Sequence, residues 1–131
     1  MTDNNNFKSF DDMEFLSFDL MKGIFDYGFQ NPSKIQNLTL KHINDGYDMI
    51  AQSQSGTGKT GAFSVGALSR VDFSSRTNQV LILSPTRELA IQSGNVVTSL
   101  GEMCKSLVTC TLVGGNHMEE DVAKLRQSCP Q

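Results

Sequence analysis

The chain has 131 residues, 38% of them hydrophobic, and a formal net charge of −3. This length and composition fit one domain with a core of ordinary size, and no apolar run is long enough to span a bilayer. The negative charge excludes a global basic field that would attract nucleic acid, so any such contact must be local. The polar start of the chain indicates no secretory signal, and we expect a flexible tail over residues 1–9.

Two residue types that often carry chemistry give no site here. The cysteines, Cys104, Cys110 and Cys129, are odd in number and lack metal-ligand spacing, which indicates free thiols in a reducing compartment. His42 and His117 have no partners at catalytic spacing. We therefore expect a cytoplasmic chain in which neither histidine binds a metal or acts as a base.

Two helices are predicted in the first third of the chain. Apolar residues recur at helical spacing from position 13 to 29, and Gly28 is well placed to end that helix. Pro32 holds its predecessor extended, and Ser33 is expected to cap a second helix that ends at Asp45 and Gly46. Residues 10–46 are therefore predicted to form a helical segment.

Three short apolar runs in the rest of the chain read as buried strands, at residues 48–51, 79–83 and 107–113. A helix-compatible stretch follows each run. The helix after the second run is expected to be capped by Thr86 and to continue to about Cys104. The helix after the third run is expected from near His117 to Arg126. Strands that alternate with helices predict an α/β domain with a parallel sheet and right-handed crossovers. Because ligands of such sheets gather at the carboxyl ends of the strands, residues 53–60, 84–90 and 114–116 should meet there.

Residues 51–60 read Ala-Gln-Ser-Gln-Ser-Gly-Thr-Gly-Lys-Thr, which predicts a phosphate-binding loop. Glycines let backbone N–H groups approach an anion, Lys59 supplies charge for the outer phosphates, and the Thr60 hydroxyl suits Mg²⁺. Ser53 stands where the usual pattern has its first glycine. A helix that begins directly after the loop would add its positive dipole end. The alternative is a flexible Ser/Gly linker, which the flanking apolar segments disfavour.

Four signatures resemble the N-terminal half of the first RecA-like domain of DEAD-box ATP-dependent RNA helicases, with the translation-initiation helicases as the nearest likeness. They are Phe10-Asp-Asp-Met13 with Gly28-Phe29-Gln-Asn-Pro32-Ser-Lys-Ile35-Gln36, the phosphate loop, Pro85-Thr-Arg-Glu-Leu-Ala90, and Gly114-Gly115. The resemblance implies a Q-motif helical segment over residues 10–46, followed by a truncated RecA-like P-loop domain with a parallel sheet over residues 47–131.

The resemblance also implies an ATP site. The Gln36 amide can donate to N7 and accept from the N6 amino group of adenine, which would select ATP over GTP, and Phe10 resembles the family's aromatic that stacks on the base. Taken alone, Gln36 could equally be a solvated helix residue. The implied ATP contacts are Phe10, Phe29, Gln36, Ser53, Gln54, Ser55, Gly56, Thr57, Gly58, Lys59 and Thr60, with Thr60 also contacting Mg²⁺ bound to the nucleotide.

A second implied site binds RNA. Pro85, Thr86 and Arg87 would contact single-stranded RNA through phosphate-binding groups that read no base, with Gly114 and Gly115 permitting close approach of the strand. Binding should then be independent of sequence. Arg87 could instead form a structural salt bridge, and the glycines could be a plain turn. The likeness also implies translation-type helicase cofactors as partners.

Hydrolysis in this class needs an acidic pair at the end of a buried strand, and none of the predicted strands ends in one. The acidic run at 119–121 follows a glycine turn and opens a helix, where carboxylates favour the dipole. The family's acidic motif, its Ser-Ala-Thr motif and its second domain are also absent. We therefore expect a truncated helicase that binds ATP and RNA at most. The alternative is an inert nucleotide-binding or protein-interaction fragment. The sequence lacks the motifs expected of a small P-loop kinase or GTPase.

Overall fold

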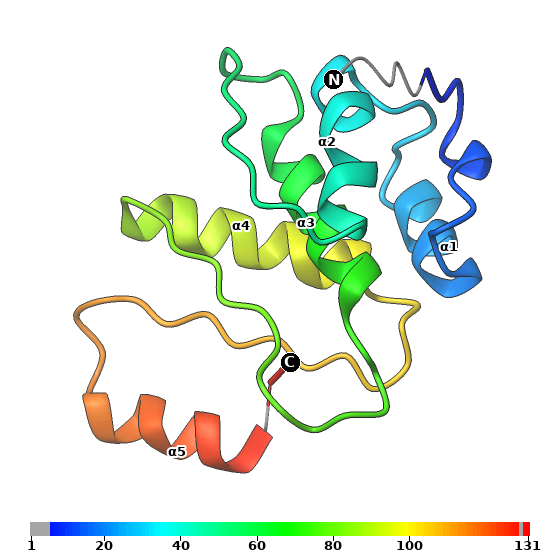
Figure 1. Ribbon diagram of the computed structural model, residues 1–131. Helices are drawn as coiled ribbons and strands as arrows, with labels where there is room; N and C mark the ends of the chain where they lie inside the picture. Colours follow the sequence, from blue (N-terminus) through cyan, green and yellow to red (C-terminus); the bar gives the residue numbers. More distant parts are fainter. Residues whose placement is uncertain (1–5, 129) are drawn as a thin grey trace.

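The computed structural model describes residues 6–128 and 130–131, and their regular structure is entirely helical (Figure 1). A short 3-10 helix precedes five α-helices. Their bounds are η1 Phe10–Asp12, α1 Phe18–Asp26, α2 Lys34–Asn44, α3 Lys59–Arg70, α4 Arg87–Leu100 and α5 Met118–Ser128. The predicted helical segment of residues 10–46 thus contains η1, α1 and α2.

Side-chain caps set the start of three of the α-helices. Ser33 caps α2 and Thr86 caps α4, both as predicted. The first predicted helix is shorter than its apolar spacing indicated, because Ser17 accepts a hydrogen bond from the Leu20 N–H and starts α1 at Phe18. Past the end of α1, Gly28 adopts a φ of 102°, a left-handed conformation that suits glycine.

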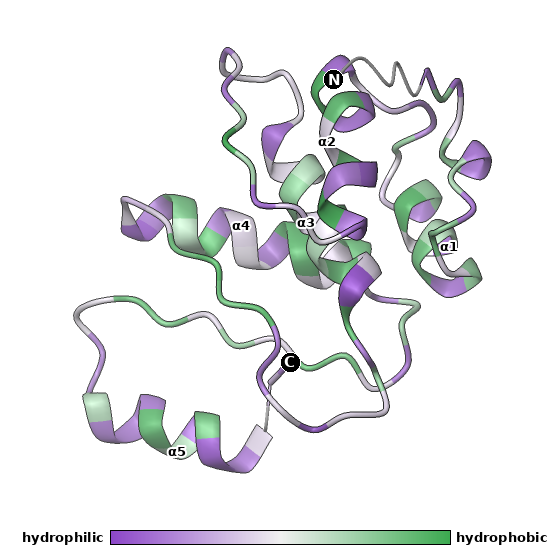
Figure 2. Cartoon of the chain, in the orientation of Figure 1, coloured by the Kyte–Doolittle hydropathy of each residue, from purple (hydrophilic) through white to green (hydrophobic). Residues whose placement is uncertain are grey.

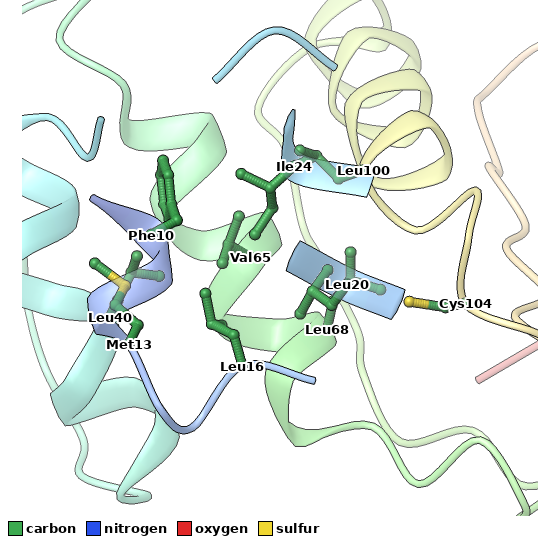
Figure 3. Close-up of a cluster of buried hydrophobic side chains, with 10 residues drawn as sticks. All are labelled: Phe10, Met13, Leu16, Leu20, Ile24, Leu40, Val65, Leu68, Leu100 and Cys104. Carbon is green, nitrogen blue, oxygen red and sulfur yellow. The ribbon is translucent and has the colours of Figure 1, made fainter. Parts of the chain in front are cut away.

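The main hydrophobic core lies between the N-terminal helices and the end of α4 (Figure 3). Burying each large apolar side chain contributes about 1.5–3 kcal/mol relative to leaving it exposed. The cluster combines η1 and α1 with side chains from α2, α3 and α4, so α3 is held from several sides. Its members are Phe10, Met13, Leu16, Leu20, Ile24, Leu40, Val65, Leu68, Leu100 and Cys104.

Glycines allow the helices to approach closely. A Cβ on Gly66 of α3 would lie 2.8 Å from Ile43 Cδ1 on α2, and a Cβ on Gly23 of α1 would lie 2.1 Å from the Leu100 carbonyl oxygen at the end of α4. Both separations are shorter than real Cβ atoms tolerate. The α1–α4 and α2–α3 contacts therefore depend on the absence of a side chain at these positions.

The predicted parallel sheet is not seen, because the described residues contain no strand. Residues 48–51, 79–83 and 107–113 are extended, but a strand is defined by pairing with a neighbour and these segments do not pair with one another. Their apolar side chains are partly uncovered: Ile50, Leu81 and Leu83 are 101%, 78% and 84% exposed. The prediction of an α/β domain is thus confirmed for the helices, whereas its sheet is not seen in the part of the chain that the structure describes.

The structure also tests the predicted N-terminal tail and the predicted free thiols. Of the predicted tail, residues 1–5 lie outside the described residues. The backbone N–H and carbonyl of Phe7 are both hydrogen-bonded to the Asn37 side-chain amide.

Cys104 and Cys110 are free thiols as predicted. Burial, with a smaller contribution from Asp19, raises the pKa of Cys104 to about 11. Cys129 lies outside the described residues. None of the helices described has the length and apolar character needed to cross a membrane.

The contact between α1 and α4 can be tested with Gly23→Ala. Alanine favours a helix by roughly 0.5–1 kcal/mol over glycine, but the new methyl group would collide with the Leu100 backbone, and overpacking typically costs about 1–3 kcal/mol. We expect a net loss of unfolding free energy in urea. The control is Gly114→Ala, where a Cβ meets no atom within 4 Å. Equal stability of both variants would contradict the observed approach of α1 to α4.

Candidate functional site

The predicted phosphate loop connects an extended segment to the start of α3. Gly56 and Gly58 have φ angles of 77° and 97°, so both use the left-handed freedom that the motif requires. Gly58 is the N-cap of α3 and offers no side-chain cap, whereas Ser17, Ser33 and Thr86 cap α1, α2 and α4. The first backbone N–H groups of α3 therefore lack a side-chain acceptor and, with the helix dipole, suit an anion.

Lys59 folds back over the loop. Its Nζ donates to the carbonyl oxygens of Ser53 and Gln54, the latter at 2.7 Å. The Thr57 hydroxyl donates to the Gln54 carbonyl at 2.7 Å and is hydrogen-bonded to the Ser53 hydroxyl. The Lys59 ammonium thus occupies the inside of the loop, bonded to acceptors that an anion would have to replace.

Gln36 joins α2 to the phosphate loop. Its Oε1 accepts from the Ser33 N–H at 2.8 Å, which completes a capping box, and its Nε2 donates to the Gly58 carbonyl at 3.2 Å. The side chain is 3% exposed, so its interpretation as a solvated helix residue is wrong. A base that reads this amide would compete with the Gly58 carbonyl for the Nε2 donor.

The two aromatic residues of the predicted adenine site differ in access. Phe10 is 0% exposed and belongs to the hydrophobic core, where its ring lies 6.4 Å from that of Phe29 at an interplanar angle of 14°. This burial argues against the predicted stacking of Phe10 on a base. Phe29 is only partly buried and packs edge-to-face with Tyr27 at 4.9 Å. The geometry therefore favours Phe29 as the aromatic neighbour of a ligand.

The structure brings the two predicted RNA-binding segments together. Arg87 Nη1 donates to the Gly114 carbonyl oxygen at 2.9 Å, and Pro85, Thr86, Arg87, Gly114 and Gly115 are all exposed. Among the described residues Arg87 makes no ion pair, so its predicted alternative as a salt bridge is not seen. The Thr86 hydroxyl accepts from the Leu89 N–H at 3.2 Å and holds the start of α4 at this surface.

A groove of about 610 Å³ is lined by residues from the end of the phosphate loop and from the first of these segments. Lys59 and Thr60 line it together with Ser84 and Pro85. Arg87 then links the rim to Gly114. The three segments expected at the carboxyl ends of parallel strands therefore gather in one region, although the strands themselves are not paired.

Sequence reasoning missed one residue of this site. A Cβ on Gly61 would lie 2.6 Å from Gln36 Nε2 and 2.8 Å from Phe29 Cε2, so only glycine leaves room for both side chains. A small residue in the first helical turn after a phosphate loop could have signalled this contact. Ser33 was predicted only as a cap, but its Oγ would lie 2.7 Å from a Cβ on Gly58 and so also packs beneath the loop.

Comparison with known proteins decides the family. Residues 33–131, from the cap of α2 to the last residue, match the family described as DEAD/DEAH box helicase. The chain belongs to this family. This confirms the resemblance that the Q-motif, phosphate-loop and Pro-Thr-Arg signatures carry.

Members of the DEAD/DEAH box helicase family resemble the chain in sequence and in structure. A probable eukaryotic initiation factor 4A of Trypanosoma cruzi is 49% identical over 121 residues, which are 90% of this chain and 30% of that protein. A DEAD box protein from Methanococcus jannaschii superposes with a TM-score of 0.81 at 31% identity, covering 89% of this chain and 32% of its own. Saccharomyces cerevisiae Dbp5 bound to RNA and ADP BeF3 gives a TM-score of 0.73 at 37% identity. This match covers 95% of the present chain and 35% of the Dbp5 chain. The chain thus spans about a third of these relatives.

The packing of Gln36 against α3 can be tested with Gly61→Ala. The added methyl group should push the Gln36 amide from the Gly58 carbonyl and lower the free energy of unfolding by about 1–3 kcal/mol, the usual cost of overpacking. In a Gln36→Ala background the same substitution should cost less, because part of the colliding side chain is gone. Urea unfolding of the four proteins measures this coupling, and purely additive effects would contradict the contact.

Proposed function

We propose that this chain is the nucleotide-binding N-terminal part of an ATP-dependent RNA helicase. Residues 53–60 would bind the ATP phosphates, Gln36 and Phe29 the adenine, and residues 85–87 with Gly114 and Gly115 the RNA backbone. The observation that carries the proposal is the Gln36–Gly58 hydrogen bond of 3.2 Å, because it connects a base-reading amide directly to the phosphate loop.

Phosphate binding would reorganise the loop in place. The Lys59 ammonium would exchange the carbonyls of Ser53 and Gln54 for phosphate oxygens, a stronger charge-assisted interaction. The uncapped N–H groups at the start of α3 would bind the same phosphates. No cluster of three His, Cys, Asp or Glu side chains suited to a metal is found in residues 6–128 and 130–131. Mg²⁺ would therefore arrive with ATP and be contacted by the Thr60 hydroxyl.

RNA would bind across the exposed surface formed by Arg87 and Gly114. The Arg87 guanidinium already faces a carbonyl oxygen, and it would gain a charge-assisted bond to a phosphate oxygen instead. If the Arg87 guanidinium and the backbone N–H groups at the start of α4 contact phosphate, these contacts carry no sequence information, so binding would be independent of sequence. In the whole helicase architecture, ATP would close two domains on single-stranded RNA and hydrolysis would release it.

The chain alone is proposed to be inactive as an ATPase. The groove beside Lys59 and Thr60 is lined by no described Asp or Glu, so nothing there would position an attacking water. The acidic residues at 119–121 lie in the first turn of α5, where Glu119 and Glu120 are exposed and Asp121 is half-buried. Translation-type helicase cofactors and a cytoplasmic location are proposed from the likeness to initiation factor 4A of Trypanosoma cruzi.

Base selection can be tested with Gln36→Ala. The wild-type chain should bind a fluorescent ATP analogue more tightly than the matching GTP analogue, and the variant should lose this preference, since one bidentate amide contact discriminates bases by about 1–3 kcal/mol. The exposed Gln30→Ala is the matched control and should keep the preference. Lys59→Ala should weaken both nucleotides equally. Unchanged discrimination in Gln36→Ala would rule out the adenine assignment.

Turnover can be tested on the same 131 residues. With saturating single-stranded RNA, phosphate release from ATP should not exceed that of Lys59→Ala, because the carboxylates that hold Mg²⁺ and position water are not in the groove. Nucleotide binding is measured in parallel to show that the site is loaded. Rapid, RNA-stimulated release that depends on Lys59 would overturn the proposal of an inactive chain while leaving nucleotide binding intact.

A further inference from the structure

The side-chain amide of Asn37 binds the first described residues of the chain to the first turn of α2. Its Oδ1 accepts from the Phe7 N–H at 2.9 Å, and its Nδ2 donates to the Phe7 carbonyl at 3.1 Å. One side chain thus binds both main-chain groups of a residue 30 positions away. We call residues 7–13 the N-terminal strap. Figure 2 shows apolar residues of the strap between polar ones.

The same amide also contacts the turn that leads into α2. Asn37 Nδ2 lies 3.5 Å from the Pro32 carbonyl oxygen, a longer hydrogen bond than the two to Phe7. Asn37 is only half-buried, yet three of its amide's four hydrogen-bonding positions are used within the chain. It therefore connects two segments that are distant in sequence, the N-terminal strap and residues 29–32.

The strap is also fixed near its other end. Asp12 Oδ2 accepts from the Lys8 N–H at 2.8 Å and from the Ser9 N–H at 3.0 Å, and Ser9 caps η1 in return. These bonds hold the turn that carries Phe10 into the core, where Figure 3 shows it in the same cluster as Leu40 of α2. The strap therefore delivers one buried aromatic ring to a defined place.

Phe10 supports the aromatic side chain of the proposed adenine site. Its ring lies 6.4 Å from that of Phe29 at an interplanar angle of 14°, and Tyr27 packs against Phe29 edge-to-face. A Cβ on Gly61 would lie 2.8 Å from Phe29 Cε2 and 2.6 Å from Gln36 Nε2, so the Phe29 ring and the Gln36 amide meet the same point of α3. The strap thus acts on Phe29 through Phe10, beside the amide proposed to read the base.

We propose that Asn37 is a positioning residue for nucleotide binding. By binding Phe7 and Pro32 it holds the strap and the segment of Phe29 in place, so that the Phe29 ring is ordered before a base arrives. This inference rests on the proposed function. An aromatic ring that is already ordered contributes more to affinity, because less conformational freedom is lost on binding.

The two side chains proposed to contact the base should differ in what they recognise. An aromatic ring stacks on the face of any base, whereas the Gln36 amide would read one edge of adenine. Loss of Asn37 should therefore weaken ATP and GTP by the same factor and leave the preference for ATP intact. A ligand that has phosphates but no base should not respond to Asn37.

The test uses Asn37→Leu, which keeps the approximate size of the side chain and removes its hydrogen bonds. Calorimetric titration of the 131-residue chain should show ATP and GTP binding at least threefold more weakly to the variant, by equal factors, and tripolyphosphate binding unchanged. Asn95→Leu, at an exposed position of α4, is the matched control and should bind all three ligands as the wild type does. Weaker binding of tripolyphosphate to Asn37→Leu would indicate general damage and contradict the proposal.

A double-mutant cycle identifies Phe29 as the side chain through which Asn37 acts. In a Phe29→Ala background, Asn37→Leu should cause no further loss of ATP affinity, and additive effects would overturn the proposal. Amide exchange at Phe7 should be faster in Asn37→Leu, which checks that the strap is released. If the wild-type chain bound ATP no better than tripolyphosphate, the adenine site itself would be wrong. Unchanged ATP affinity in Asn37→Leu, beside a wild type that prefers ATP, would overturn this inference alone.

Discussion

The close contact between α2 and α3 is the constraint on which the site depends. Gly58, Gly61 and Gly66 lie along the side of α3 that meets α2, and a Cβ at each would come within 2.8 Å of an α2 or Ser33 atom. This approach allows Gln36 to reach the Gly58 carbonyl. It also fixes the N-terminus of α3, whose N–H groups have no side-chain cap and are proposed to bind the nucleotide phosphates. The position of the proposed nucleotide site is therefore set by the packing of α2 against α3.

Local sequence signals predicted the helices well because the interactions that begin and end them are local. Ser33 and Thr86 cap α2 and α4 with hydrogen bonds that span three residues, and Gly28 supplies the left-handed turn after α1. Strands need partners that are distant in sequence. Residues 79–83 have the composition of a buried strand, but nothing in a local pattern reports whether a neighbour stands beside them. The described chain places one residue, Gln131, where that neighbour would run.

Residue identity at the site was predictable, whereas residue environment was not. The phosphate-loop pattern singled out Lys59, and the structure shows its ammonium bonded to the loop's own carbonyls. Phe10 was predicted to stack on the base, yet its side chain is fully buried in the core, with its ring 6.4 Å from that of Phe29. Gly61 escaped prediction because the need for glycine arises only where α2 crosses α3. Such requirements come from tertiary packing, and no spacing rule contains them.

The charge distribution determines how anionic ligands could be attracted. With a net charge of −3 the chain repels polyanions at long range, so attraction must come from groups that act within a few ångströms. Two helices meet this need: α3 begins at Lys59 and α4 begins at Arg87, so each places a cationic side chain on a positive dipole end. Both helix starts face the same groove region. Fixed dipoles near a partly buried surface are screened by salt less than exposed side chains are. The affinity for a nucleotide in the loop should therefore depend less on ionic strength than the affinity for an RNA strand that contacts the exposed Arg87.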